Sequence, residues 1–528
     1  MKFLKSAIGI LLFTLLVSVA WPQNQPPPAS SSTKTVDELG LQVQDQTKDR
    51  SNQGNDQNRD PQTAPPQTSA GNGAGGAQAD SETTVSPKEA KELFRSVDEI
   101  LQFASQDTGL PIKHKVKRRL AKRDEVQSYI EKSFKDDKDA KRLERSSEVL
   151  KKFGLLPRDF DLSNFLVAML REQVAGYYDE KTKTVNLLNW LIAEQQKPVL
   201  AHELTHALQD QSFGLEKWMR GSAEGKDKKD KNREDPSPAD VENDEETSAR
   251  QAVVEGQAMV VLYDYSLAPQ TLLNSPQIVE ALKQSMLVGT PDSPKFRDAP
   301  IFLKEELTFP YRYGLDFTVA LLRAGGKELA YAGAFQNPPK TTREIMEPKT
   351  YLAHEKLEPV KMIDMEKDLK DYVPFDIGAM GEFDVDVLVE QYAGQDQATA
   401  IYPEWRGGYY FSGKPKANPS APLALLYVSR WSNAAKAAEF AAIYAKSLAQ
   451  RYQKRQGLGT DGKIAEDAPP ADSWRTLRGR HAWRTEEGVV VIEVRGDAVL
   501  ISEGLDDDTT KTVEADFWPE EKAAPAKP

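Results

Sequence analysis

The chain contains no cysteine, and histidine is almost as scarce, with five residues in a length of 528. Without cysteine there are no disulfide bonds, no thiolate metal ligands and no cysteine nucleophile. The absence does not identify the compartment, because exported proteins can also lack cysteine. A metal site in this chain must therefore be built from a few histidines and from carboxylates.

The chain also lacks an excess of positive charge. Asp and Glu number 81 against 69 for Lys and Arg, so the formal net charge is −12. A nucleic-acid-binding surface requires clustered Lys and Arg to meet the phosphates. The composition therefore argues against a nucleic-acid partner and favours plain solubility.

Long apolar runs are absent except at the N-terminus. There, "MKFLKS" is followed by the apolar stretch "AIGILLFTLLVSVA" and a small residue at Ala20. This layout predicts a signal peptide over residues 1–20 and export to the periplasm or beyond. A retained anchor is the alternative, but the run is short for a membrane span of about 20 residues. No later stretch could span a bilayer, so no integral span is expected after cleavage.

Two terminal segments have the composition of disordered chain. Residues 21–85 are mainly Gln, Asn, Pro, Ser, Gly and Asp and have few large apolar side chains to bury. Residues 519–528 consist largely of Pro, Ala, Lys and Glu. We expect a low-complexity linker in the first segment and a disordered tail in the second.

The folded part predicts an α+β protein with two domains. Residues 86–375 are expected to be mainly helical, with a β-hairpin at Val174–Trp190 and a charged insertion loop at 221–246. Residues 376–518 combine strand-like runs with an alanine-rich amphipathic helix, which predicts a smaller C-terminal α+β domain. Arg-Gly-Asp at 495–497 is interpreted as a hairpin turn.

The sequence His202-Glu203-Leu204-Thr205-His206 carries the strongest chemical pattern. It lies in a predicted helix at Lys197–Gln211, where residues four apart project within about 40° of each other. Both imidazoles can then reach one cation, and zinc prefers such nitrogen ligands. Glu203 can act as general base on a water beside the metal. The alternative is two ordinary histidines on a partly buried helix.

A catalytic zinc requires a third protein ligand and one open position. The extended pattern HExxHxxGxxH needs glycine at 209 and histidine at 212, but the chain has Gln209 and Ser212. The third ligand must therefore come from elsewhere in the chain, and a glutamate on a later helix is the other standard solution.

Glu255 is the best candidate, because it is the only charged residue between Arg250 and Asp264. A carboxylate in an apolar helix is costly unless it is paired or binds a metal. The adjacent Gly256 would allow another backbone to approach closely. A buried ion pair, with Arg250 as the partner, is the alternative. Weaker candidates lie in polar surroundings at Glu216, Glu245 and Glu246.

With Glu255 on a second helix, the motif resembles the gluzincin-type zinc metallopeptidases. The resemblance implies a mainly helical zincin-like domain, His202, His206 and Glu255 as ligands of one Zn²⁺ per chain, and Glu203 as catalytic base. It implies hydrolysis of peptide bonds in a peptide or protein substrate through a zinc-bound water. A non-hydrolytic zinc-binding factor of the cell envelope, acting in binding or assembly, is the alternative; a structural zinc site has no need of Glu203.

The resemblance is incomplete around the third ligand. Thermolysin-type enzymes have Asn before the glutamate and Asp four residues after it, where this chain has Val254 and Met259. In this group an edge strand beside the motif helix binds the substrate backbone, and the predicted hairpin could do so here.

Further helpers of the chemistry are expected near the metal. Asp210, one turn after His206, could orient that imidazole, although a solvated position at the helix end is equally consistent with the sequence. Tyr311 or Tyr313 could donate to a developing oxyanion, with core packing as the alternative for each.

Overall fold

The computed structural model describes residues 85–134, 137–173, 176–221, 235–288, 293–459, 461–465 and 475–519. The expected signal peptide, the expected linker up to residue 84, residues 222–234 of the insertion and residues 520–528 of the tail lie outside this part of the chain. None of the helices in the described ranges is long and apolar enough to cross a membrane.

The first described helix, α2 (Pro87–Thr108), begins with a capping box. The Ser86 hydroxyl accepts a hydrogen bond from the Glu89 backbone N–H, and the Glu89 carboxylate accepts one from the Ser86 N–H. This arrangement satisfies two donors that the first helical turn would otherwise leave unpaired. The buried face of α2 packs against α6 (Ala193–Phe213), the helix that carries the HELTH motif.

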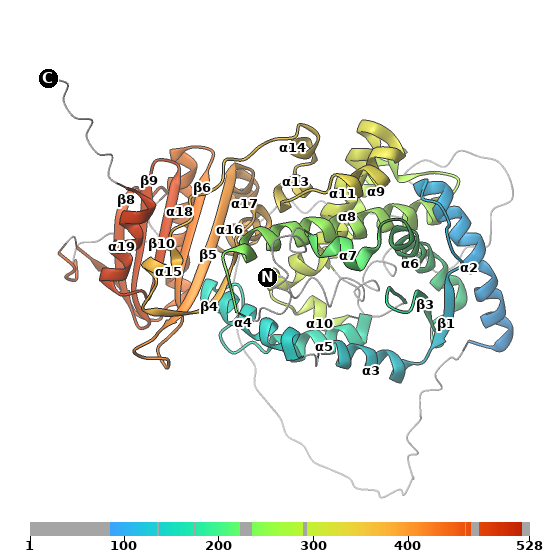
Figure 1. Cartoon of the computed structure of the whole chain (residues 1–528), viewed down its shortest axis with the longest axis horizontal. Coiled ribbons are helices and arrows are strands. Elements are labelled where there is room, and N and C mark those ends of the chain that lie inside the picture. Colours follow the sequence, from blue (N-terminus) through green and yellow to red (C-terminus); the bar gives the residue numbers. More distant parts are fainter. Residues whose placement is uncertain are drawn as a thin grey trace, which may run out of the picture. The chain divides into compact units, whose positions relative to one another are not determined.

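A three-stranded sheet lies beside α6 (Figure 1). Its strand order is β1 (Lys117–Ala121), β3 (Thr184–Leu188) and β2 (Tyr177–Asp179). β2 and β3 form the predicted antiparallel hairpin, and β1 pairs in parallel with β3. β2 is consequently one of the two edge strands, and β1 is the other.

The helices α3 (Arg123–Phe134) and α4 (Asp137–Phe153) come after β1 in the chain. They are followed by α5 (Leu162–Gln173).

The expected insertion loop at 221–246 is partly wrong. α8 (Ala239–Leu267) begins inside it, so residues 239–246 are helical. Acidic residues in the first turn, Asp240 and Glu242, suit the positive end of a helix dipole. Glu245 is buried, and its carboxylate accepts hydrogen bonds of 2.9 Å from both the N–H and the hydroxyl of Thr342. The charge run therefore contains buried structural residues as well as solvated ones.

Helix α11 (Ile301–Lys327) packs along α8. It is followed by a π-helical segment, η6 (Glu328–Gly333), and by α12 (Ala334–Gln336). The remaining short helices of this helical part are α7 (Leu215–Met219), η5 (Leu272–Asn274), α9 (Pro276–Val288), α10 (Pro294–Arg297), α13 (Thr342–Met346) and α14 (Pro348–Leu352).

The second sheet is antiparallel and has seven strands in the order β4-β5-β6-β10-β9-β8-β7. Its strands are β4 (Tyr372–Ala379), β5 (Trp405–Pro415), β6 (Ala424–Trp431), β7 (Arg455–Leu458), β8 (Gly479–Thr485), β9 (Gly488–Arg495) and β10 (Ala498–Glu503). The helices of this region are α15 (Met365–Asp368), α16 (Glu382–Ala393), α17 (Gln395–Ile401), η7 (Tyr402–Glu404), α18 (Ala434–Arg451) and α19 (Asp507–Phe517).

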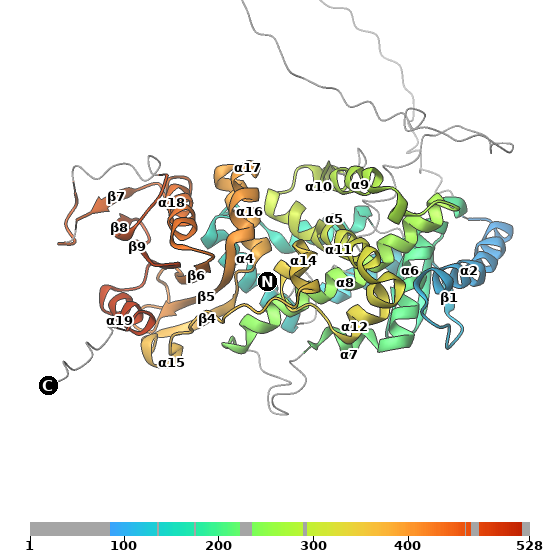
Figure 2. The same cartoon turned by 90° about the horizontal axis from the view of Figure 1, so that it is seen from above.

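Both faces of this sheet are covered, as Figure 2 shows for α18 on one side and α19 on the other. In β6, Leu425 and Tyr427 belong to the core cluster that contains α18, whereas Leu426 and Val428 belong to the cluster that contains α19. Successive side chains of a strand point to opposite faces, so β6 is buried on both sides. The mixed α+β class is therefore confirmed. Gly496 and Asp497 form the turn between β9, which ends at Arg495, and β10.

The seven-stranded sheet and the helical part are in contact. All described residues fall in one compact unit. Phe153 at the end of α4 packs edge-to-face on Tyr410 and Tyr427 of the sheet, with ring centroids 5.8 Å away in each case. A buried Arg451–Glu503 ion pair of 2.7 Å lies next to Lys152, whose ammonium is 3.9 Å from the same carboxylate.

Candidate metal centre

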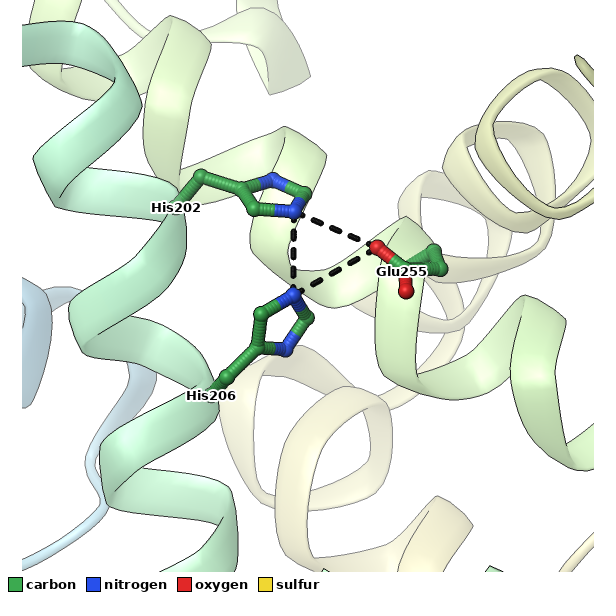
Figure 3. Close-up of side chains that lie close together, drawn as sticks. All are labelled: His202, His206 and Glu255. Carbon is green, nitrogen blue, oxygen red and sulfur yellow. Dashed lines mark hydrogen bonds and ion pairs between the residues drawn. The ribbon is translucent and has the colours of Figure 1, made fainter. Parts of the chain in front are cut away.

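The side chains of His202, His206 and Glu255 converge on one point (Figure 3). The Glu255 Oε2 atom lies 3.2 Å from Nε2 of His202 and 3.4 Å from Nε2 of His206. The two Nε2 atoms are 3.0 Å apart. The three residues that the sequence singles out as ligands thus face one another from two helices.

Helix geometry explains this convergence. His202 and His206 are four residues apart on α6 and therefore share a face. Glu255 comes from the middle of α8, which packs against α6. All three are buried, with exposed fractions of 1%, 5% and 2% respectively. A carboxylate in such surroundings is stable only with partners, and here its partners are the two imidazoles.

The donor set fits a tetrahedral metal. Two ligand atoms bound to zinc at 2.0–2.1 Å and at the tetrahedral angle lie about 3.3 Å apart. The three observed separations of 3.0, 3.2 and 3.4 Å surround this value. Among the described residues, no other group of three or more His, Asp or Glu side chains meets the same geometric condition. The centre can therefore hold a metal ion and would leave one coordination position open.

The charges of the three groups are strongly coupled. Burial lowers the pKa of His202 to about 4, and the charge on His206 adds to this effect. Burial also acts to lower the pKa of His206, but Glu255, Glu203 and Gln209 outweigh it and raise that pKa to about 9. Burial opposes ionisation of Glu255, yet the two histidines lower its pKa. At neutral pH a proton on His206 balances Glu255, and a bound cation would replace that proton.

Glu203 lies beside these ligands and is held by the edge strand β2. Its Oε2 accepts a 2.7 Å hydrogen bond from the backbone N–H of Tyr178 in β2. Burial raises the pKa of Glu203 to about 7, with a further contribution from Glu255 and an opposing one from His206. A buried carboxyl whose pKa is near neutrality is suited to accept and return a proton.

The residue that contacts His206 beyond the metal ligands is Gln209, not Asp210. The Gln209 Oε1 atom lies 2.9 Å from Nδ1 of His206. Asp210 is buried and accepts hydrogen bonds from the Tyr178 hydroxyl at 2.8 Å and from the Lys183 ammonium at 2.5 Å. Both sequence interpretations of Asp210 are therefore wrong: it binds β2 and the β2–β3 turn, and it is not solvated.

The sequence analysis did not predict this role of Gln209. It considered the residue only as the position where the pattern HExxHxxGxxH would require glycine. Its spacing is nevertheless informative, since a side chain three residues after His206 lies next to it on the helix surface.

Of the two tyrosines, Tyr311 is the one beside the metal centre. Its ring stacks near that of His202, with centroids 6.4 Å apart and planes inclined by 29°. Burial raises the pKa of Tyr311 well above its usual value, and the carboxylates of Glu255 and Glu203 raise it further. Tyr313 instead donates a hydrogen bond to Asp386 at 3.3 Å.

Arg250, the alternative partner of Glu255, forms its contacts with another residue. Arg250 donates to the backbone carbonyl of Trp218 at 3.0 Å, and its guanidinium lies 4.7 Å from the centroid of the Trp218 ring. Two of the three weaker ligand candidates have other partners as well: Glu216 forms an ion pair with Arg220, and Glu245 accepts hydrogen bonds from Thr342.

No family model and no curated protein matches this chain. Among solved structures it is similar to a protein from Chloroflexus aurantiacus described as a "putative hydrolase with a novel fold". The two share 15% identity over 53% of this chain and 92% of that one, with a TM-score of 0.32. Since a likeness this weak carries no argument about activity, function has to be argued from the site itself.

Proposed function

We propose that this protein is an exported, zinc-dependent metallopeptidase of the gluzincin type with a zincin-like catalytic region. The observation that carries the proposal is the convergence of His202, His206 and Glu255, with Glu203 held beside them. Two imidazoles and one carboxylate, with a fourth position open, form a typical catalytic zinc set. The proposed substrate is a peptide or a protein.

In the proposed reaction Glu203 transfers the proton, and the metal would polarise the substrate. When bound, zinc supplies Lewis-acid polarisation of the scissile carbonyl and acidifies the attacking water. Glu203 takes a proton from that water as its oxygen attacks the carbonyl carbon. Glu203 then returns the proton to the leaving amine nitrogen as the C–N bond breaks, so the carboxylate is regenerated. The Tyr178 N–H holds Glu203 in position during both transfers.

Tyr311 is the proposed donor to the developing oxyanion. Its phenol stays protonated at neutral pH, and its ring lies next to the ring of His202. Loss of one oxyanion donor typically lowers kcat by about 10²–10³. The substitution Tyr311→Phe should therefore lower kcat by this factor while the zinc content stays unchanged.

Strand β2 is the proposed docking edge for an extended substrate. It is an edge strand of its sheet, and it contacts α6. The Tyr178 N–H already donates to Glu203, so a substrate backbone would pair with other groups of this strand.

Metal analysis of the purified protein tests the first step of the proposal. We expect one zinc ion per chain for the wild type, lost in His202→Ala and in Glu255→Ala. Stoichiometric zinc in these two variants would show that the ion binds elsewhere.

The substitution Glu203→Gln tests the second step. It keeps the shape of the side chain but removes the base, so zinc should be retained and hydrolysis lost. Activity is measured as new termini in a complex peptide mixture, detected by mass spectrometry. Absence of cleavage by the zinc-loaded wild type, or identical cleavage by Glu203→Gln, would favour the alternative of a non-hydrolytic zinc-binding envelope factor.

A further inference from the structure

Two buried glutamines connect the metal centre to a distant segment. Gln209 follows the motif on α6, and Gln257 lies two residues after Glu255 on α8. Both side chains are fully buried. The Gln209 Nε2 atom donates to the backbone carbonyl of Val254 and to Oε1 of Gln257, each at 3.0 Å. The Gln257 Nε2 atom donates to the carbonyls of Ala330 and Tyr331, at 2.8 and 3.2 Å.

The orientation of both amides follows from their backbone partners. A carbonyl oxygen can only accept, so the nitrogen of each amide must face the carbonyls of Val254, Ala330 and Tyr331. The Gln257 oxygen then faces Gln209, and the Gln209 oxygen faces Nδ1 of His206 at 2.9 Å. An oxygen at that position requires a proton on Nδ1.

The π-helical segment η6 contains the Ala330 carbonyl that accepts the hydrogen bond from Gln257. In an α-helix the N–H of Ala334 would donate to the carbonyl of Ala330, four residues back. Here it donates to the carbonyl of Leu329, five residues back. The Ala330 carbonyl therefore does not accept from Ala334, and it accepts from Gln257. Such π turns frequently occur at functional sites.

We infer that Gln209 and Gln257 are positioning residues that fix His206 with its proton on Nδ1, so that Nε2 presents a lone pair to the metal. This inference rests on the proposed metal centre and explains how the ligand His206 is oriented in it. Residues that orient metal-bound histidines typically affect metal affinity by about 10- to 100-fold when they are removed.

Substitutions at Gln209 separate positioning from packing. Gln209→Leu fills the same space but accepts nothing, so the zinc Kd, measured by competition with a chelator, should rise about 10- to 100-fold. Gln209→Glu still accepts from Nδ1, so its zinc Kd should not exceed that of the wild type, although it lowers the melting temperature because its oxygens face the Val254 carbonyl and Gln257. The matched control is Gln196→Leu, which removes another buried glutamine of α6 whose amide binds only Leu188 and Leu191. The Gln196→Leu substitution should lower the melting temperature and leave the zinc Kd unchanged.

A spectroscopic measurement on the wild type is independent of these variants. In the zinc-loaded protein labelled with ¹⁵N-histidine, Nδ1 of His206 should carry a proton that exchanges slowly with solvent. A bare Nδ1, or equal zinc affinity in Gln209→Leu and the wild type, would overturn the inference; so would equal weakening in Gln209→Leu and Gln209→Glu. These outcomes leave the proposed function intact, whereas a wild type that binds no zinc refutes the metal centre itself.

Discussion

Gly256 and Gly314 are in backbone contact where α8 crosses α11. A Cβ atom added to Gly256 would lie 2.1 Å from the carbonyl carbon and oxygen of Gly314, and one added to Gly314 would lie 2.2 Å from the carbonyl oxygen of Ala252. No side chain fits at either position. Because Gly256 directly follows Glu255, the same crossing that joins the two helices also sets the position of the proposed third ligand.

The substitution Gly256→Ala should therefore damage both the fold and the metal centre. Its methyl group must push α11 away from α8, and overpacking of this kind typically costs about 1–3 kcal/mol, occasionally more. We expect a lower melting temperature and a weaker zinc affinity. The double variant Gly256→Ala/Gly314→Ala should cost less than the two single costs combined, because either methyl alone already separates the helices. Unchanged stability in Gly256→Ala would contradict the close crossing.

Metal removal should destabilise the protein. A ligand that binds only the folded state stabilises it by about 4 kcal/mol when its free concentration is a thousand times its Kd. Thermal unfolding should therefore shift to lower temperature with a chelator and recover with added zinc. His202→Ala is the control, and its melting temperature should respond to neither treatment.

Asp210 and Gln209 are neighbours with different expected roles. Asp210→Ala leaves the buried Tyr178 hydroxyl without its acceptor, which typically costs about 1–3 kcal/mol of stability. Its zinc affinity should stay within about twofold of the wild type, because His206 is oriented through Gln209. If Asp210→Ala bound zinc as weakly as Gln209→Leu, Asp210 would also be needed to orient His206.

The sequence was sufficient to predict the three converging residues. Helix periodicity alone places His202 and His206 on one face, and a single carboxylate in an apolar helix must have a partner, which identified Glu255. Gly256 predicted a close backbone approach, and the structure shows Gly314 at that point. Each residue was recognisable from a pattern of one or two helical turns, whereas the packing of α8 against α6 that brings them together was not.

The residues that hydrogen-bond around the metal centre could not be predicted from local patterns. Gln257 carries no charge, and its acceptors Ala330 and Tyr331 lie more than 70 positions further along the chain, in a π-helical segment without a sequence pattern of its own. The start of α8 was misjudged for a related reason. Glu245 is stabilised by Thr342, a residue from a distant part of the chain, so a run of charges that resembles a solvated loop is partly core.

Asp386 should make the stability of the protein depend on pH. Only 8% of it is exposed, and it accepts a hydrogen bond from the Tyr313 hydroxyl. Burial raises its pKa to about 7, with further contributions from Glu305 and Glu390. In the unfolded chain an aspartate has a pKa of about 3.9. Between these two values the folded state binds more protons at Asp386 than the unfolded state does. The contribution of Asp386 to stability is therefore complete below about pH 4 and is lost as pH rises to about 7.

The substitution Asp386→Asn removes this titration while its amide oxygen can still accept from Tyr313. Each unit of pKa shift corresponds to about 1.4 kcal/mol, so the gain at pH 8 should amount to a few kcal/mol at most. We expect the melting temperature of Asp386→Asn to exceed that of the wild type at pH 8 and the difference to shrink toward pH 5. Asp396→Asn, at an exposed position, is the matched control. A difference that grows toward acid pH would mean that Asp386 is stabilised as a carboxylate, because a depressed pKa reverses the sign of the linkage.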